Sequence, residues 1–324
     1  MNKFNFNVLL LMIISVLLLI YLLRNKNNQN EYMKYISDIQ TNIEFLPSGK
    51  LGYFYEPEKN RVITKKPEWP GKSVVHAINA DGMHEDREYP LEKTEGTFRI
   101  IALGDSFTYG VYVETAENWT EVLERELSGN SDCSGYPKFE VLNLGVSGYD
   151  LEYTAERLNR TGLKYSPDLV VWLVSPWNFT SINEYSLPLQ EKYIRELPVN
   201  SDTLDWRDAV NQSAEDVMDK LGLAGMLNYQ SRVLAELRRD YGGKLLFVGN
   251  GKIPGKYSAV IKELAEKDGN IVYEEISDVT GDKSLKLPDN HPNPAGHGKI
   301  AAEILAVLTD MYFPDCRFNP PEGF

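Results

Sequence analysis

Residues 98 to 110 read FRIIALGDSFTYG, an apolar run followed at once by a Gly-Asp-Ser turn. The run from Phe98 to Leu103 has the length and the branched apolar side chains of a strand that is buried on both faces. Gly104 and Asp105 then break the run, and Ser106 follows the end of the predicted strand. Ligands and catalytic groups collect at this edge of open α/β sheets. Ser106 is therefore a candidate nucleophile, although a Gly-Asp-Ser turn alone is more typical of a helix cap.

Similar apolar runs alternate with helical patterns along the rest of the chain. Further strands are predicted at 139–143, 169–174, 244–248 and 270–273, and helices at 119–127, 151–162, 214–240, 258–267 and 295–311. This alternation indicates a parallel sheet covered by helices on both faces. We therefore predict an α/β fold with a doubly wound, flavodoxin-like parallel sheet of five strands. Residues 179–243, between the third and fourth strands, form a connection long enough to have structure of its own.

The amino terminus has a different composition. Residues 8–23 read VLLLMIISVLLLIYLL, and Phe4 and Phe6 extend this apolar stretch. About 20 residues at about 1.5 Å each cross a bilayer core, and no small-residue cleavage site follows the stretch. We therefore predict an uncleaved signal anchor, a transmembrane helix, over 1–23, followed by a polar tether over 24–40, a lead-in segment over 41–97 and the main domain over 98–324.

The charges beside the predicted anchor favour two different orientations. Arg24, Lys26 and Lys34 outnumber Lys3, which favours a cytoplasmic domain. A very short amino-terminal tail before a single apolar segment is instead typical of a chain whose large domain is exported. We expect a membrane-anchored protein with an extracytoplasmic main domain.

The composition argues against several classes of partner. A formal net charge of -13 at pH 7, with no Lys/Arg cluster, opposes binding to nucleic acid. Four histidines and two cysteines without a CxxC spacing give little from which to build a metal site, so we expect none. If the domain is exported, Cys133 and Cys316 either pair as a disulfide or stay as free thiols.

A second polar motif precedes the last predicted helix. Residues 287–297 read LPDNHPNPAGH and bring Asp289 and His291 to the same sheet edge as Ser106. A serine hydroxyl needs a base to take its proton, and the base needs a partner that fixes its tautomer. We interpret Ser106 as nucleophile, His291 as base and Asp289 as its partner. Asp282 is the alternative partner, and a Ser-His dyad is the other alternative.

Two further loops at this edge are candidates for an oxyanion hole, the set of donors that stabilises the developing negative charge. The second strand is followed by NLGVSG, which ends at Gly148, where glycine lets the backbone approach a substrate. The third strand is followed by Pro176, Trp177 and Asn178, and the Asn178 amide is a possible donor.

The segments around Ser106, Gly148, Asn178 and His291 resemble, in this order, the four blocks of the SGNH (GDSL) hydrolase superfamily. The resemblance covers about residues 98–311. It implies that Ser106 is the nucleophile and also an oxyanion donor through its own N–H, that Gly148 and Asn178 complete the oxyanion hole, and that His291 is the base.

Two features depart from this pattern. The third block usually reads Gly-x-Asn-Asp, whereas residues 176–179 read PWNF. The acid usually stands three residues before the histidine, whereas Asp289 stands two before His291, as in some exopolysaccharide-linked members. The altered third block motivates one alternative, a degenerate, non-catalytic domain that binds a glycan or a partner protein.

The resemblance implies a serine esterase that acts through an acyl-serine intermediate and needs no cofactor. With a membrane anchor, it is similar to proteins that act on cell-surface or exported polysaccharides, so hydrolysis or transfer of an O-acetyl group on a carbohydrate is the favoured reaction. A lipid-ester hydrolase or thioesterase is the alternative chemistry. Trp177 and Tyr109 either stack on a sugar or pack inside the domain, and His297 is interpreted as structural.

Overall fold

The computed structural model describes residues 15–16, 43–67, 69–129, 136, 138–196, 206–316 and 318. The predicted anchor over 1–23 lies outside these residues apart from Ser15 and Val16, and the predicted tether over 24–40 lies wholly outside them. Within the described ranges, no helix combines the length and the apolar composition that crossing a membrane requires. Cys133 also lies outside them, so its pairing with Cys316 stays a prediction.

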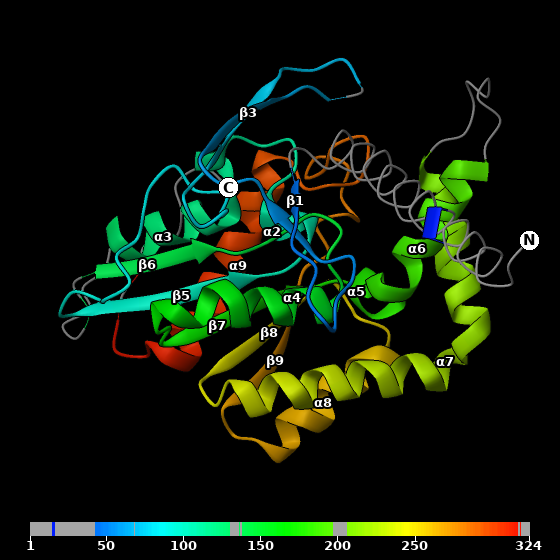
Figure 1. Cartoon of the computed structure of the whole chain (residues 1–324). Helices are drawn as coiled ribbons and strands as arrows, with labels where there is room; N and C mark the ends of the chain where they lie inside the picture. The colour runs from blue at the N-terminus through cyan, green and yellow to red at the C-terminus, as the bar shows by residue number, and fades with distance from the viewer. Residues whose placement is uncertain are drawn as a thin grey trace, which may run out of the picture.

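Five parallel strands form the central sheet, in the spatial order β6-β5-β7-β8-β9 (Figure 1). The strands are β5 (Thr97–Leu103), β6 (Lys138–Asn143), β7 (Leu169–Val174), β8 (Leu245–Asn250) and β9 (Ile271–Ile276). The predicted doubly wound sheet is confirmed, and the strand order reverses between β5 and β7. In flavodoxin-like sheets, this reversal is the point at which ligands bind beyond the carboxyl ends of the strands.

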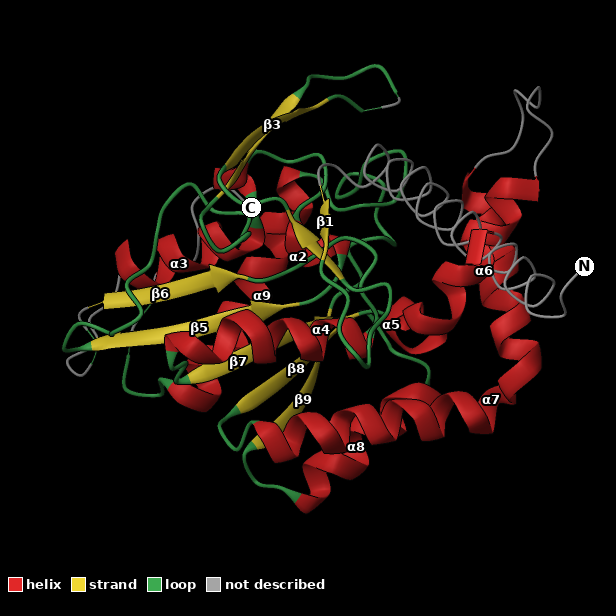
Figure 2. Cartoon of the chain, in the orientation of Figure 1, coloured by secondary structure: helices red, strands yellow, loops and turns green. Residues whose placement is uncertain are grey.

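Helices cover both faces of the sheet because side chains alternate along each strand. Ile101 and Leu103 pack on the face covered by α4, α7 and α8, and Ile100 and Ala102 on the face covered by α3 and α9. Figure 2 shows the strands enclosed between these helices. Their bounds are α3 (Trp119–Gly129), α4 (Leu151–Arg157), α7 (Trp206–Asp240), α8 (Gly255–Lys267) and α9 (Pro294–Tyr312). Short turns of helix lie at η1 (Thr115–Glu117), η2 (Leu158–Gly162) and η3 (Leu163–Tyr165).

The connection between β7 and β8 has helical structure of its own, as expected from its length. It contains α5 (Pro176–Thr180), α6 (Asn183–Glu196) and α7, which begins at Trp206 and not at the predicted residue 214. Gly222 has a φ of 63° within α7, a left-handed conformation that glycine adopts readily. The helix changes direction there (Figure 1), and the helical pattern did not predict this bend.

The lead-in segment forms two antiparallel hairpins against the main sheet domain. They are β1 (Ile43–Phe45) with β2 (Tyr55–Pro57), and β3 (Arg61–Lys65) with β4 (Val74–Ile78). Phe54 and Tyr55 pack in a buried aromatic cluster with Tyr149 and Tyr153, beside the loop that follows β6. The second hairpin packs on the buried ring of Tyr109, which lies just beyond β5.

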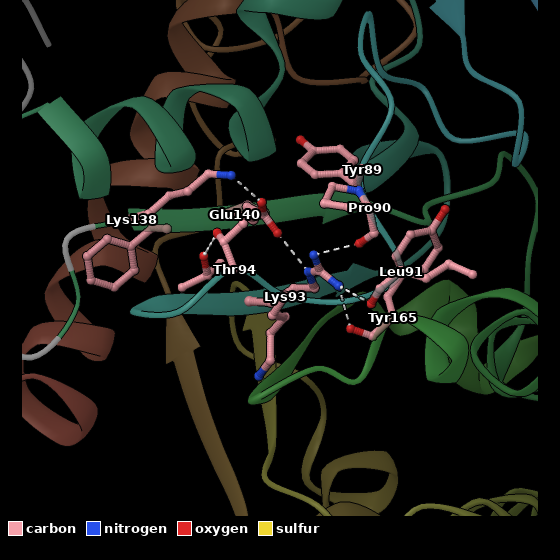
Figure 3. A network of polar contacts seen from close by, with 12 residues as sticks. Tyr89, Pro90, Leu91, Lys93, Thr94, Lys138, Glu140 and Tyr165 are labelled. Carbon is pink, nitrogen blue, oxygen red and sulfur yellow. Dashed lines mark hydrogen bonds and ion pairs between the residues drawn. The ribbon is translucent and has the colours of Figure 1, made fainter.

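A buried ion pair anchors the amino end of the sheet. The Arg99 Nε donates to Glu140 Oε2 at 2.7 Å, and the other guanidinium nitrogens donate to the carbonyls of Pro90, Leu91 and Tyr165. In Figure 3, Glu140 lies between Lys138 and the segment that carries Pro90 and Leu91. Each guanidinium nitrogen therefore has a protein acceptor, and the chain before β5 is fixed to the sheet.

Candidate active site

A tight turn at the end of β5 presents Ser106. A side chain at Gly104 would collide with the Thr108 hydroxyl and lie 2.8 Å from the carbonyl of Leu173, so only glycine fits there. The carboxylate of Asp105 then caps α2 (Ser106–Tyr109) by accepting from the Phe107 N–H at 3.0 Å. Ser106 is thus the first residue of a one-turn helix and is partly exposed.

Ser106, His291 and Asp289 lie together, as the sequence predicted. The His291 Nε2 is 2.8 Å from Ser106 Oγ, and the His291 Nδ1 is 2.8 Å from Asp289 Oδ2. With Asp289 ionised, Nδ1 carries the ring proton, and Nε2 is left to accept the serine hydroxyl proton. The arrangement is that of a Ser-His-Asp triad.

The unusual spacing of Asp289 and His291 is explained by the residue between them. Asn290 has a φ of 71°, in the left-handed region that asparagine tolerates better than most residues. The resulting turn lets one Asp289 oxygen accept from the His291 backbone N–H at 3.2 Å while the other meets the ring. A separation of two residues therefore brings the carboxylate into contact with the imidazole.

The alternative partner, Asp282, is occupied elsewhere. Its Oδ1 accepts from the backbone N–H of Ser284 at 2.8 Å and from the Ser284 hydroxyl at 2.7 Å, and its side chain is exposed. Between the two candidates, the geometry favours Asp289.

The two carboxylates near Ser106 have opposite pKa shifts. Burial alone would raise the pKa of Asp289, but its hydrogen bonds with His291 and the charge of that ring hold it below the usual value. Burial raises the pKa of Asp105, which the hydrogen bonds from Phe107 and Ser175 only partly offset. Asp289 is therefore the carboxylate that stays ionised in contact with the imidazole.

Two loops beyond the carboxyl ends of β5 and β6 contain backbone N–H groups that are candidates for an oxyanion hole. Gly148 has a φ of 79° at the loop that follows β6, a conformation that favours glycine. Among the described residues, the N–H groups of Ser106 and Gly148 donate to no protein acceptor. These are the two backbone donors that the sequence predicted for an oxyanion hole.

Asn178, the third predicted donor, is fully buried and already engaged. Its side-chain nitrogen donates to Asp105 Oδ2 at 3.3 Å and to the carbonyl of Tyr149 at 3.1 Å, and its oxygen accepts from Ser175. The structure brings Asn178 beside Asp105, in the turn that presents Ser106, and its amide contacts the loops that follow β5, β6 and β7. An oxyanion role would require this amide to release one of its acceptors.

Of the other imidazole and aromatic side chains named in the sequence analysis, His297 and Tyr109 are buried. The Nδ1 of His297 accepts from the Trp119 backbone N–H at 3.2 Å, and burial lowers its pKa to about 3. The ring of Tyr109 packs between His76 and His84, which leaves it no open face for a sugar. Trp177 is partly exposed. No group of three or more metal-binding side chains is arranged to hold an ion in the part of the chain that the structure describes.

No family model matches the chain. Peptide chain release factor 1 of Aliarcobacter butzleri (strain RM4018) is 32% identical over 122 residues, which are 37% of this chain and 34% of that protein. A match over about a third of each protein does not place the chain in that family.

Several solved structures resemble this one at low sequence identity. TesA has a TM-score of 0.42 and 16% identity, with 65% of this chain and 98% of TesA covered. A lipase/acylhydrolase from Enterococcus faecalis has a TM-score of 0.41 and 15% identity, covering 70% and 100% of the two chains. A mutant of Axe2, an acetylxylan esterase from Geobacillus stearothermophilus, has a TM-score of 0.41 and 15% identity, covering 68% and 97%. At these values the similarity assigns neither a family nor a substrate.

Three residues beside the site were not predicted from the sequence. The Ser175 hydroxyl donates to Asp105 at 3.1 Å, the Tyr55 hydroxyl to the carbonyl of Ser147 at 2.8 Å, and the Asn183 side chain to the carbonyl of Gly148 at 3.0 Å. Tyr55 and Asn183 come from segments with no catalytic motif, and their partners are distant in sequence. No local pattern could have found them.

Proposed function

We propose that the chain is a serine esterase that hydrolyses or transfers a short acyl group. Ser106 acts as nucleophile, His291 as general base and Asp289 as the partner of His291. The observation that carries this proposal is the pair of 2.8 Å contacts that joins the serine hydroxyl to the imidazole and the imidazole to the carboxylate. Their place at the switch point of the sheet supports the same conclusion.

The reaction follows from the positions of the hydrogen-bonding atoms. As the Ser106 Oγ bonds to the acyl carbon, its proton passes to the His291 Nε2, and the imidazolium is stabilised by Asp289. The carbonyl oxygen becomes negative and accepts from the N–H groups of Ser106 and Gly148. His291 then protonates the leaving alcohol, and an acyl-serine remains.

A second half-reaction releases the acyl group. Water, or an acceptor hydroxyl for transfer, gives its proton to the His291 Nε2 and attacks the acyl carbon, and the bond to the Ser106 Oγ breaks. The serine takes back the proton from His291. We include Asn178 as a third oxyanion donor, for which its amide turns from Asp105 or from the carbonyl of Tyr149 toward the substrate.

For the substrate, we propose an O-acetyl group on a carbohydrate or cell-surface polysaccharide. This choice rests on the likeness of the sequence to SGNH proteins of exported polysaccharides, together with an apolar amino terminus that would hold the domain beside the membrane. The partly exposed Trp177 offers an indole ring next to Asn178 for stacking on a sugar. We propose that residues 1–23 anchor the chain and that the domain is extracytoplasmic, which protease accessibility in intact cells tests.

The experiment compares the full-length protein, purified in detergent, with its Ser106→Ala variant on p-nitrophenyl acetate and then on acetylated oligosaccharides. We expect turnover by the wild type and a loss on the order of 10⁴-fold or more in the variant. Equal rates for the two proteins, with both folded, would refute the esterase.

One observation favours a second candidate, a binding domain without catalysis. Because both donor contacts of the Asn178 amide are made within the protein, the site has fewer ready donors than the sequence pattern implies. If the chain is a binding domain, the wild type should bind an acetylated glycan without turnover, and the Ser106→Ala variant should keep the same affinity. Isothermal titration with the same oligosaccharides separates the two functions.

A further inference from the structure

Three consecutive carbonyl groups in the loop after β6 are each held by a side chain from elsewhere in the chain. The carbonyl of Ser147 accepts from the Tyr55 hydroxyl at 2.8 Å, that of Gly148 from the Asn183 amide at 3.0 Å, and that of Tyr149 from the Asn178 amide at 3.1 Å. The donors belong to the first hairpin, to the start of α6 and to α5. Three separate segments thus converge on the loop that contains Gly148.

The hydrogen bond from Tyr55 also fixes the direction of the Gly148 N–H. The carbonyl of Ser147 and the N–H of Gly148 belong to one planar, trans peptide group, so they point in opposite directions. The Tyr55 hydroxyl draws the carbonyl toward the aromatic cluster of the first hairpin. The N–H must then point away from that cluster, and no described protein group accepts from it.

Tyr55 and Asn183 are both held in place by contacts of their own. Tyr55 is 1% exposed, and its ring packs edge-on against Tyr149 at 5.3 Å and against Tyr153 at 6.0 Å between centroids. Asn183 donates its backbone N–H to the buried carboxyl of Asp150 at 2.5 Å, and the same carboxyl caps α4. Neither donor can shift without moving a packed element, so the loop has a defined orientation before substrate arrives.

We propose that Tyr55 and Asn183 are positioning residues that set the Gly148 N–H in the direction of the Ser106 oxyanion. The inference rests on the proposed esterase function and extends it to two segments outside the catalytic motifs. It makes the first hairpin and the start of α6 parts of the catalytic architecture. Preorganised donors act only when they are aimed where the charge develops, and a misplacement of about 1 Å is enough to reduce the rate about 100-fold.

The test uses Tyr55→Phe in the full-length protein, because phenylalanine keeps the packed ring and removes only the hydroxyl. Tyr165→Phe is the matched control, since Tyr165 is equally buried and its hydroxyl donates to Asp81, away from the loop. For Tyr55→Phe we expect kcat to fall about 10- to 100-fold with KM close to wild type. Inhibition by a phenylboronic acid, which forms a tetrahedral adduct with a serine, should weaken by a similar factor.

Asn183→Ala is the second variant and should show the same split between kcat and KM. Wild-type kcat in both variants would overturn the proposal. So would losses that match those of Tyr165→Phe, or losses that follow a fall in the thermal unfolding midpoint, because a structural role gives these results. If the wild type shows no turnover that depends on Ser106, the esterase proposal fails, and this inference falls with it.

Discussion

The two ends of the central sheet hold their charged side chains in opposite ways. At the amino end, Arg99 and Glu140 have side chains 0% and 3% exposed, and the guanidinium is saturated with acceptors. At the carboxyl end, the His291 and Asp289 side chains are 25% and 13% exposed, and the imidazole contacts the Ser106 hydroxyl. The same framework thus has one end where opposite charges are buried and paired within the protein and another where a partly exposed pair contacts a hydroxyl group.

The largest effect should come from His291→Ala. Removal of the base should lower kcat/KM on the order of 10⁴- to 10⁶-fold, as for other triads. The free energy of unfolding should change far less, by about 1 kcal/mol, since the ion pair is partly exposed and Asp289 keeps the backbone N–H of residue 291 as a donor. Esterase assays and urea denaturation of the full-length protein measure both. A large fall in stability with activity preserved would show that His291 has a structural role and would contradict its assignment as the base.

The next effect separates the two candidate acids. Asp289→Asn should lower kcat about 10⁴-fold, because the amide no longer holds the Nδ1 proton of His291 or stabilises its charge. Asp282→Asn is the matched control and should leave kcat unchanged, because the carboxylate of Asp282 accepts its hydrogen bonds from Ser284, away from the imidazole. Equal losses in the two variants, or a loss confined to Asp282→Asn, would show that the triad is assigned wrongly.

At the amino end, the expected effect is on stability. Glu140→Gln keeps the shape of the side chain but leaves the buried Arg99 charge unpaired, which should lower the free energy of unfolding by about 3 to 5 kcal/mol. Lys138→Met removes the more exposed partner of the same carboxylate and should change it by less than about 1 kcal/mol. Denaturant titration checks both values. In both variants, activity per folded molecule should match wild type. A loss of kcat without a loss of stability would contradict the separation of the two ends of the sheet.

The last prediction concerns the dependence of stability on pH. In the described part of the chain, Asp150 forms no ion pair, and burial raises its pKa to about 7. Hydrogen bonds from the N–H groups of Tyr153 and Asn183 oppose this rise, and the nearby carboxylates of Glu152 and Glu184 add to it. The usual value is 3.8. The folded protein therefore binds more protons than the unfolded chain between about pH 4 and pH 7, and stability falls as pH rises through this window.

Asp150→Asn removes this titration. The plot of unfolding free energy against pH should become flatter by up to about 1.4 kcal/mol per pH unit between pH 4 and pH 7. Urea denaturation at a series of pH values measures the slope. A slope identical to wild type would show that Asp150 keeps an ordinary pKa.

The periodic and local features were predictable from the sequence, and the contacts between segments were not. The strands were predicted because short runs of branched apolar side chains are typical of strands that are buried on both faces. Ser106, Asp289 and His291 were predicted because strand ends in a parallel sheet share one edge, and the structure brings them together.

The remaining features depend on tertiary structure. The helices α5 and α6 were not predicted, because α5 is a single turn and α6 is rich in polar residues, so neither has a strong apolar period. The bend at Gly222 was not predicted either. Tyr55 and Asn183 reach carbonyls 92 and 35 residues away. Their partners depend on how the hairpin and the insertion dock, which no local pattern encodes.

The most direct test of the account is covalent labelling of the full-length protein with a fluorophosphonate, followed by peptide mass spectrometry. We predict a single adduct on Ser106, lost in Ser106→Ala and strongly slowed in His291→Ala, with Asp282→Asn labelled like wild type. An absence of adduct on the folded wild type, or an adduct on a different residue, would contradict the assignment of Ser106 as an activated nucleophile.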